Sequence, residues 1–356
     1  MTDNTWPTVD TELIDDVTLY SAKLIIPVTG PVIIDGAVAI HGDRVVHVGK
    51  RRWVLKALKQ EMTAHGTIHE RHWDGVLTPG LINAHTHLQY SGMVQVGQGT
   101  YDRFRAWELA FNEVYAEAQK TQPWKQWAED GARQMVESGT TAAADIVTDL
   151  DAAGALASQG MHGIAYWEVM GWHNAEWMEK GRTELIRQLR RMNEEQLPNL
   201  GISPHAPYTL ESEPFVDLPD IARQLNMRLH IHLAETPLEA GTYPPVLTTY
   251  SAADWSDHDW ESYRQLKEVG KGASAIQFVD QLGSLGPDVH IAHGVWANGE
   301  DRRILRQRGV GVALCPRSNR ITNTGKDAPV REYLEEGNLV SVGTDSLSST
   351  PTLDLL

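Results

Sequence analysis

From Val76 onward, short apolar or β-branched segments alternate with longer stretches of helical character, and this alternation is the strongest constraint on the fold. It is typical of parallel βαβ units. Eight such repeats predict a closed (β/α)₈ TIM-type barrel of the α/β class. The predicted strands cover residues 81–87, 141–147, 164–170, 201–207, 229–235, 289–295, 310–316 and 339–345.

The residues before the barrel follow a different pattern. Short strands separated by turns at Gly36 and Gly42, with alternation of apolar and polar residues in DRVVHVG, indicate antiparallel β structure. We therefore predict an N-terminal tail over residues 1–16, a small β-sandwich domain over 17–75 and the barrel over 76–356.

Two segments depart from a regular barrel. The connection from Thr236 to Ala273 is too long for a simple crossover, so we expect a lid or substrate loop there. Leu356 lies only 11 residues beyond Asp345, which leaves little room for an eighth helix. Whether the chain is a C-terminally truncated fragment stays open.

Composition narrows the kinds of partner. The 47 acidic and 31 basic side chains give a formal charge of −16, which disfavours nucleic acid and anionic lipid and favours a small-molecule partner. No stretch approaches the ~18 apolar residues of a membrane helix, and the N-terminus lacks a signal pattern, so we predict a cytoplasmic location. Cys315 is the single cysteine, which excludes an internal disulfide and a cysteine-based zinc site.

Imidazole and carboxylate side chains gather at the C-terminal ends of the predicted strands, where barrels of this type carry their reactive groups. Side chains two apart on a strand share a face, about 6.6 Å of rise apart, so His85 and His87 can face one ion. Alone, this pair is equally compatible with ordinary polar residues near a strand end. His232 and Asp345 at other strand ends favour a metal site.

Two further strands carry more than one histidine. On 229–235, His230 and His232 share a face, and we choose His232 as the ligand because it is nearer the C-terminal end. His230 is then a hydrogen-bonded histidine one layer down. His290 and His293 are three apart and cannot both point inward from a regular strand, so we choose His293 for its terminal position.

Several motifs together resemble the amidohydrolase superfamily. Within it, the chain is most similar to the deaminase group that includes cytosine, methylthioadenosine, S-adenosylhomocysteine and aminodeoxyfutalosine deaminases. The motifs are PGLINAHTH, SPHAPYT, HIHLAET, IAHGVW, CPRSN and VGTDS. The stretches HTHLQYSGM, YWEVMGW and LCPRSN most resemble the aminodeoxyfutalosine branch. The C-terminal strands that usually complete the small β domain of this family are missing, so we expect a partial sandwich.

The resemblance implies one divalent ion, Zn²⁺ or Fe²⁺, with zinc preferred. It implies that His85, His87, His232 and Asp345 hold this ion. No lysine stands at the end of strand 164–170 or of the strand after it to form the carbamate bridge of two-metal members, which favours a single ion.

The resemblance also assigns roles around the ion. It implies that Glu235 is a proton shuttle, that His293 positions the water and that His205 contacts the substrate. A glutamate on the corresponding strand binds metal in certain relatives, but we prefer substrate contact for Glu168. For Arg317, substrate contact and loop anchoring both stay open.

These assignments predict a metal-dependent hydrolytic deaminase acting on an aminated N-heterocycle. The preferred substrate is an adenine nucleoside such as 6-aminodeoxyfutalosine, and ammonia is released. Asp345 would take a proton from the attacking water, and Glu235 would protonate the ring nitrogen. Glu235 should therefore have a raised pKa in a dehydrated pocket.

Other readings stay open. A hydrolase of a cyclic amide or a chlorohydrolase could use the same scaffold, and a non-catalytic binding protein could keep the barrel without the chemistry. A homodimer is also left open. Four tryptophans close in sequence to the site segments could form pocket walls: Trp107, Trp167, Trp172 and Trp296.

Overall fold

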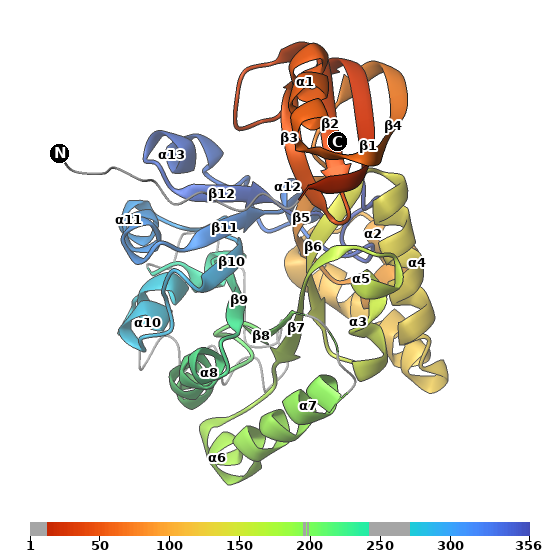
Figure 1. The fold of residues 1–356 in the computed structure, drawn as a ribbon. Helices are drawn as coiled ribbons and strands as arrows, with labels where there is room; N and C mark the ends of the chain where they lie inside the picture. Colours follow the sequence, from red (N-terminus) through yellow and green to blue (C-terminus); the bar gives the residue numbers. More distant parts are fainter. Residues whose placement is uncertain (1–12, 195–196, 198, 242–270) are drawn as a thin grey trace, which may run out of the picture. The chain divides into compact units, whose positions relative to one another are not determined.

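The computed structural model describes residues 13–194, 197, 199–241 and 271–356. It divides into two compact units, Met1–Gly80 and Leu81–Leu356 (Figure 1). The more detailed division after residues 16 and 75 stays a prediction. Most of the connection from Thr236 to Ala273, for which we predict a lid or substrate loop, lies outside the described residues.

The first unit contains one four-stranded sheet with the order β3-β2-β1-β4. Its strands are β1 (Ile14–Ile25), β2 (Ile33–His41), β3 (Arg44–Lys50) and β4 (Met62–Leu77). The pairings β1–β2 and β2–β3 are antiparallel, as the alternation predicts, whereas β1 and β4 pair in parallel. The parallel pairing is possible because helix α1 (Arg51–Glu61) carries the chain back between β3 and β4.

A small apolar core joins α1 to one face of this sheet. Val54 and Leu58, four residues apart on the helix, are buried with apolar residues of the two central strands, Val17, Leu19, Ala37 and Ala39. The described part of this unit is therefore a small N-terminal sheet domain, as predicted, built as one sheet covered by a helix.

The second unit is built on eight parallel strands in sequential order, which confirms the predicted barrel (Figure 1). Each observed strand overlaps one predicted from the sequence. The strands are β5 (Leu81–Thr86), β6 (Thr140–Val147), β7 (His162–Val169), β8 (Leu200–Pro204), β9 (Arg228–Leu233), β10 (Val289–His293), β11 (Gly311–Leu314) and β12 (Leu339–Val342).

Helices and short helical turns connect these strands. The helices are α2 (Val94–Gly97), α3 (Phe104–Thr121), α4 (Trp124–Glu137), α5 (Ala155–Ser158), α6 (Asn174–Glu176), α7 (Arg182–Glu194), α8 (Ser212–Gln224), α10 (Ala275–Gln281), α11 (Gly299–Arg308), α12 (Pro316–Ile321) and α13 (Val330–Glu335). The short turns are η1 (Leu88–Met93), η2 (Leu150–Ala152), η3 (Trp177–Gly181) and η4 (Pro237–Glu239).

Local sequence signals fix the ends of α11. The side chain of Asn298 accepts hydrogen bonds from the backbone N–H groups of Glu300 and Asp301, which would otherwise lack partners in the first turn. Gly309, with φ of 71°, ends the helix in the left-handed conformation that glycine adopts without steric cost.

The first and last barrel strands meet through a polar seam, which we define as Asn83 and His85 facing Gly343, Thr344 and Asp345. Asn83 Nδ2 donates to Thr344 Oγ1 at 2.7 Å, and the Thr344 N–H donates back to Asn83 Oδ1 at 3.1 Å. The Asp345 N–H donates to the His85 carbonyl at 3.0 Å. The seam therefore fixes His85 and Asp345, from opposite ends of the barrel sequence, beside each other.

Gly343 allows this close approach. A Cβ atom at this position would lie 2.8 Å from His85 Cβ and 2.9 Å from its backbone N and O. We expect Gly343→Ala to lower the free energy of unfolding by about 1–3 kcal/mol, because overpacking a tight contact displaces backbone. Urea unfolding measures this loss. Gly337→Asn is the control. A Cβ atom at Gly337, which has φ of 77°, would have no atom within 4 Å, so this substitution should lower the free energy of unfolding by less.

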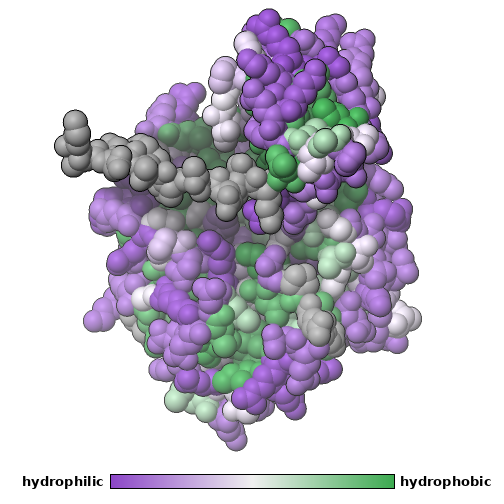
Figure 2. Space-filling model, viewed as in Figure 1, coloured by the Kyte–Doolittle hydropathy of each residue, from purple (hydrophilic) through white to green (hydrophobic). Residues whose placement is uncertain are grey.

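The surface is mostly polar. Figure 2 shows hydrophilic residues over much of the visible face, with smaller apolar areas between them. Among the described residues, no helix has both the length and the apolar character needed to cross a bilayer.

Candidate metal centre and active site

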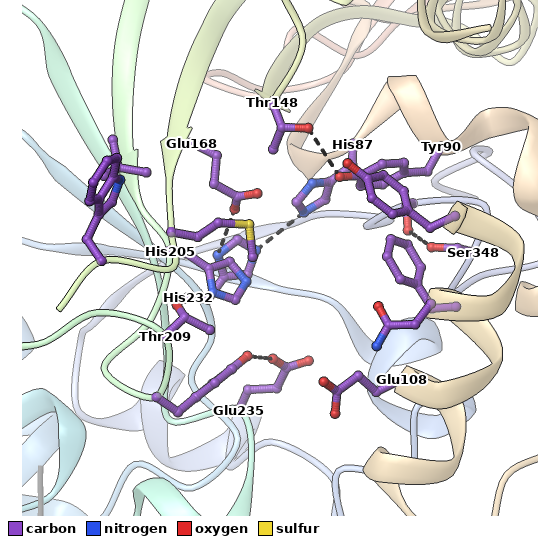
Figure 3. A pocket seen from close by; sticks show the side chains of 18 of the residues that line it. His87, Tyr90, Glu108, Thr148, Glu168, His205, Thr209, His232, Glu235 and Ser348 are labelled. Carbon is purple, nitrogen blue, oxygen red and sulfur yellow. Dashed lines mark hydrogen bonds and ion pairs between the residues drawn. The ribbon is translucent and has the colours of Figure 1, made fainter. Parts of the chain in front are cut away.

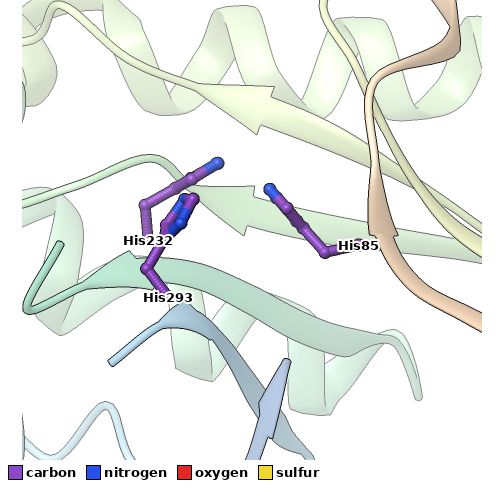
Figure 4. Close-up of side chains that lie close together, drawn as sticks. All are labelled: His85, His232 and His293. Atoms are coloured by element: carbon purple, nitrogen blue, oxygen red, sulfur yellow. The ribbon is translucent and has the colours of Figure 1, made fainter. Parts of the chain in front are cut away.

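Three histidines from non-neighbouring parts of the sequence converge at the C-terminal end of the barrel strands. Figure 4 shows His85, His232 and His293 pointing toward one another. The ring of His85 lies 4.8 Å from that of His232 and 5.4 Å from that of His293, centroid to centroid. Each lies in or next to a different strand, β5, β9 or β10, so the barrel closure brings them together.

Ligand atoms of the four side chains predicted to bind the metal lie close to one another in this region. His87 Nε2 lies 3.3 Å from His232 Nε2, and Asp345 Oδ1 lies 3.7 Å from His85 Nε2 and 3.6 Å from His87 Nε2. Ligands about 2.0–2.1 Å from a tetrahedral zinc ion would be roughly 3.3 Å apart. His85, His87 and Asp345 therefore form one group that could hold a divalent ion, and His232 lies beside it, next to His87. The assignment of all four side chains to one ion stays a prediction.

The hydrogen bonding of His85 also fits this reading. Its Nε2 atom is buried and has no hydrogen-bond partner among the described residues. A buried polar atom without a partner is costly unless something else satisfies it. A metal ion at the convergence of these side chains would accept the lone pair of this nitrogen.

Burial keeps these imidazoles neutral, which is the form that binds metals. Desolvation, assisted by neighbouring histidines, lowers the pKa values of His85 and His232 well below the ordinary value. Desolvation also lowers the pKa of His87 to about 4, although the charge of Asp345 opposes this shift.

Asp345 is held in place through both carboxylate oxygens. Ser318 Oγ donates to Oδ2 at 2.7 Å, and the Ser346 N–H donates to Oδ1 at 2.8 Å. Burial would raise the pKa of this carboxyl, but His87, His293 and the two hydrogen bonds hold it below the ordinary value. Asp345 is therefore ionised at neutral pH and can act as a ligand or accept a proton.

Glu235 has the opposite electrostatic character. Burial, reinforced by the charge of Asp345, raises the pKa of Glu235 to about 8. Its Oε1 atom lies 3.6 Å from His293 Nε2, and Tyr208 Oη donates to its Oε2 atom at 3.4 Å. The raised pKa agrees with the prediction from the sequence, and it means that this carboxyl carries a proton at neutral pH.

The turn that carries Glu235 is clamped by a second buried carboxylate. Glu239 accepts backbone N–H hydrogen bonds from Ala234, Glu235 and Thr236 at 2.8, 2.8 and 2.9 Å. Residue Ala234 has φ of 54°, a conformation that non-glycine residues seldom adopt. Three hydrogen bonds to one carboxylate explain how this unfavourable turn is held.

The same backbone feature recurs at two other site residues. His293 has φ of 73° and Asp345 has φ of 64°. Such conformations cost of order 1–3 kcal/mol each and persist only where surrounding contacts impose them. For His293, Nδ1 lies 3.0 Å from Asn319 Oδ1, a contact that fixes the ring and leaves Nε2 toward Glu235.

A cavity of about 650 Å³ opens over these groups. In Figure 3, Glu168, His205 and His232 lie along one side of it, and Tyr90 and Glu108 lie on the other. The predicted site residues that line it are His87, Glu168, His205, His232, Glu235, His293 and Asp345. This volume is within the ~300–1,000 Å³ range of small-molecule sites.

Aromatic side chains form much of the cavity wall. Trp107, Trp167 and Trp172 line it, as expected. Trp296 does not: its Nε1 donates to the Thr324 carbonyl at 2.7 Å, and Lys326 Nζ lies 4.2 Å from the centre of its ring. It is a loop-packing residue.

Arg317 also lies outside the residues that line the cavity. Its guanidinium donates to the backbone carbonyl of Asp354. Of the two roles that the sequence leaves open, this contact corresponds to loop anchoring, and the substrate-binding assignment has no support from this position.

Glu168 and His205 lie beside the histidine cluster. Glu168 Oε1 is 3.7 Å from His232 Nδ1, and His205 Nδ1 is 2.8 Å from Thr209 Oγ1. Burial, with a contribution from Asp345, raises the pKa of Glu168 to about 8, and burial lowers the pKa of His205 to about 3. Both side chains are therefore neutral at pH 7 and present hydrogen-bonding groups to the cavity.

The raised pKa of Glu168 predicts a pH-dependent stability change. The unfolded chain ionises this carboxyl near pH 4.5, whereas the folded protein keeps it protonated to about pH 8, so its burial destabilises the fold increasingly between these values. We expect Glu168→Gln to raise the free energy of unfolding of chelator-treated protein by about 2–4 kcal/mol at pH 7.5, and to have no such effect at pH 4. Urea unfolding at both pH values tests this.

Several residues of the site were not found by sequence reasoning. Tyr208, Ser318 and Asn319 lie within SPHAPYT and CPRSN, motifs that carry the resemblance, so polar residues inside a motif were an available signal. Glu239 follows HIHLAET by three residues, and the capping-box spacing from Thr236 to Glu239 was the signal for it.

Residues 76–243 and 246–356 match the amidohydrolase family. The chain belongs to this family. The match covers the barrel and includes every residue assigned here to the metal centre, and the family is metal-dependent.

Two relatives of this amidohydrolase at 30% identity are named as deaminases. It is 30% identical over 344 residues to the 5-methylthioadenosine/S-adenosylhomocysteine deaminase of Moorella thermoacetica, covering 93% of this chain and 70% of that protein. It is also 30% identical over 287 residues to the 5'-deoxyadenosine deaminase of Methanopyrus kandleri, covering 79% of this chain and 59% of that protein. The chain thus spans only part of the length of these relatives.

Solved structures share the fold. An adenosine deaminase from Xanthomonas campestris, with bound zinc, superposes with a TM-score of 0.73 at 21% identity, covering 97% of this chain and 72% of that one. The aminofutalosine deaminase of Helicobacter pylori, in complex with methylthio-coformycin, gives a TM-score of 0.73 at 20% identity, covering 95% and 79%. At these sequence identities, the similarity shows that the fold is shared and no more than that.

Proposed function

We propose that this amidohydrolase is a metal-dependent deaminase that removes the amino group of an adenine nucleoside by hydrolysis. The observation that carries the proposal is the pair formed by Glu235 and Asp345 at the base of one cavity. Burial leaves Glu235 protonated, with a pKa of about 8, whereas Asp345 stays ionised. Two carboxyl groups with separated pKa values supply an acid and a base at the same pH.

In this proposal His85, His87, His232 and Asp345 hold one divalent ion, with Zn²⁺ preferred to Fe²⁺. Their spacing and the buried Nε2 atom of His85 support this set. The ion supplies the chemistry that divalent metals give to hydrolases, a lower pKa of water and hence a nucleophile at neutral pH.

Different side chains of the protein accept and donate the protons of the reaction. Asp345 accepts the first proton from the attacking water. His293, held by Asn319 at 3.0 Å, directs the water by hydrogen bonding through Nε2. Glu235 donates its proton to the ring nitrogen next to the attacked carbon, which prevents negative charge from accumulating there. The proton held by Asp345 then passes to the amino group, so the carbon–nitrogen bond breaks and ammonia leaves. The hydroxyl proton of the adduct returns to Glu235 as the carbonyl forms.

The cavity supports an aromatic substrate. Trp107, Trp167 and Trp172 present ring surfaces on which a purine can stack, and the neutral Glu168 and His205 offer hydrogen bonds. The names of the relatives at 30% identity favour adenine nucleosides as the substrate class. Within this class we propose 6-aminodeoxyfutalosine, for which the support is the resemblance of HTHLQYSGM, YWEVMGW and LCPRSN to that branch.

A substrate panel tests the proposal. Zinc-loaded protein is incubated with adenosine, 5'-deoxyadenosine, methylthioadenosine, S-adenosylhomocysteine, 6-aminodeoxyfutalosine, cytosine, guanine and a chlorinated triazine, and ammonia and chloride are measured. We expect ammonia from the adenine nucleosides, with the highest kcat/KM for 6-aminodeoxyfutalosine. Chloride release, or ammonia only from cytosine or guanine, would contradict the proposed substrate class.

A further inference from the structure

The contact between His85 and His230, two fully buried residues, has no role in the chemistry described above. His85 Nδ1 lies 3.0 Å from His230 Nε2, and both residues have 0% exposure. The two residues are 145 positions apart in the sequence and lie on β5 and β9. The free ring nitrogens of the pair are His85 Nε2, which faces the proposed metal, and His230 Nδ1, and neither has a hydrogen-bond partner among the described residues.

When two neutral imidazoles form a hydrogen bond, one proton lies between their two nitrogens and is covalently bonded to one ring or to the other. If His230 Nε2 carries it, His85 accepts at Nδ1, and the proton of His85 must then be on Nε2. A protonated Nε2 has no lone pair and cannot bind a cation. If His85 Nδ1 carries the proton instead, its Nε2 lone pair is available for the metal.

We propose that His230 is a positioning residue that holds His85 in its metal-binding tautomer by accepting the Nδ1 proton. This inference rests on the proposed metal site. His230 acts as an acceptor because its own proton is on Nδ1, on the side away from His85. Histidine ligands usually donate their second N–H to such an outer partner, which fixes the ring and its tautomer.

The position of His230 separates this role from direct ligation. Among the described residues, three groups have ligand atoms close enough to share one ion, and none of them contains His230. They are His85 with His232 and His293, His85 with His87 and Asp345, and Glu168 with His205 and His232. His230 contacts the ion only through His85. The His230 ring also packs against the ring of Tyr166, with 5.3 Å between the centroids. This packing restrains the ring that forms the hydrogen bond with His85.

The chain offers a matched control for substitutions at His230. His290 is paired with His230 in the register of β9 and β10, and its ring centre lies 6.1 Å away. It is a largely buried histidine of the same barrel layer, but it belongs to none of the candidate ligand groups.

The experiment compares wild-type protein, His230→Leu, His230→Gln and His290→Gln after removal of metal with a chelator. Zinc affinity is measured by competition with a chromophoric chelator. We expect His230→Leu, which cannot accept the proton, to bind zinc about 10- to 100-fold more weakly. His230→Gln places an acceptor oxygen at the same distance along the side chain as Nε2 and should restore most of the affinity, and His290→Gln should match wild type.

Unchanged zinc affinity in His230→Leu, or equal losses in His230→Leu and His230→Gln, would overturn the inference while leaving the proposed function intact. Failure of the wild type to bind zinc would overturn both. A measurement on the wild type covers the case in which a variant does not fold. In ¹⁵N-histidine-labelled, zinc-loaded protein, NMR should show both His85 and His230 protonated at Nδ1, and an Nε2–H form of His230 would contradict the proposal.

Discussion

Glu235→Gln is expected to lower kcat for deamination by about 10²- to 10⁴-fold, the usual contribution of a positioned general acid. Glutamine has nearly the same shape and can keep the contact with Tyr208, but its amide does not deliver a proton to the ring nitrogen. Zinc content should stay at the wild-type level because Glu235 is not one of the four proposed ligands. Steady-state kinetics and metal analysis of the same preparation provide both values.

The pH dependence of the wild type follows from the same group. The pKa of Glu235 is raised to about 8, so the carboxyl holds its proton below that pH and loses it above. We therefore expect kcat to fall as pH rises through about 8. The fall should be absent from the residual activity of Glu235→Gln.

Glu211→Gln is the control for this substitution. Glu211 is also a buried glutamate of the barrel, with 9% exposure, but it accepts hydrogen bonds from the Asn174 N–H and contacts His173 instead of lining the cavity. Its kcat should stay close to wild type. A Glu235→Gln enzyme with near-normal turnover would show that Glu235 is not the proton donor.

Removal of metal is expected to have the second large effect. Chelator treatment should lower activity by at least about 10³-fold, since metal-ion catalysis supplies several kcal/mol and about 1.36 kcal/mol corresponds to a factor of ten. Returning Zn²⁺ should restore the activity. Unfolding should also become easier, because a ligand at 1,000 times its Kd stabilises the folded state by about 4 kcal/mol.

Replacement of a proposed ligand should reproduce this loss. We expect His232→Ala to lose bound zinc, activity and the zinc-dependent rise in melting temperature together. His162→Ala, which changes an exposed histidine at the start of β7, is the control and should keep all three. Stoichiometric zinc binding by His232→Ala at wild-type affinity would contradict the ligand assignment.

The sequence was sufficient for the barrel and for the neighbourhood of its site. Parallel strands alternating with helices close into a barrel in which all C-terminal strand ends meet, so a polar residue at such an end is directed to one region wherever it lies in the chain. His85, His232 and His293 could therefore be placed together from their positions alone. Their roles remain predictions.

The sequence was less informative where the fold depends on long-range pairing. Alternation in the first unit predicts strands, but it does not specify that β1 and β4 run in parallel, because the same residues could pair in either direction. Helix α1 has only two buried residues, Val54 and Leu58, which is a weak helical signal in a segment bounded by strands.

By itself, the sequence of this protein determined the order of strands and helices in the barrel and the chemical types of residue at the strand ends, because both follow from local residue patterns. Only the tertiary structure decided which atoms meet: the Asn83–Thr344 seam across 261 residues, the clamp of Glu239 on the turn of Glu235, and the pairing of His85 with His230. These contacts depend on strand register, positive backbone φ angles and side-chain rotamers. All three are set by packing between distant segments, so they cannot be derived from a local sequence pattern.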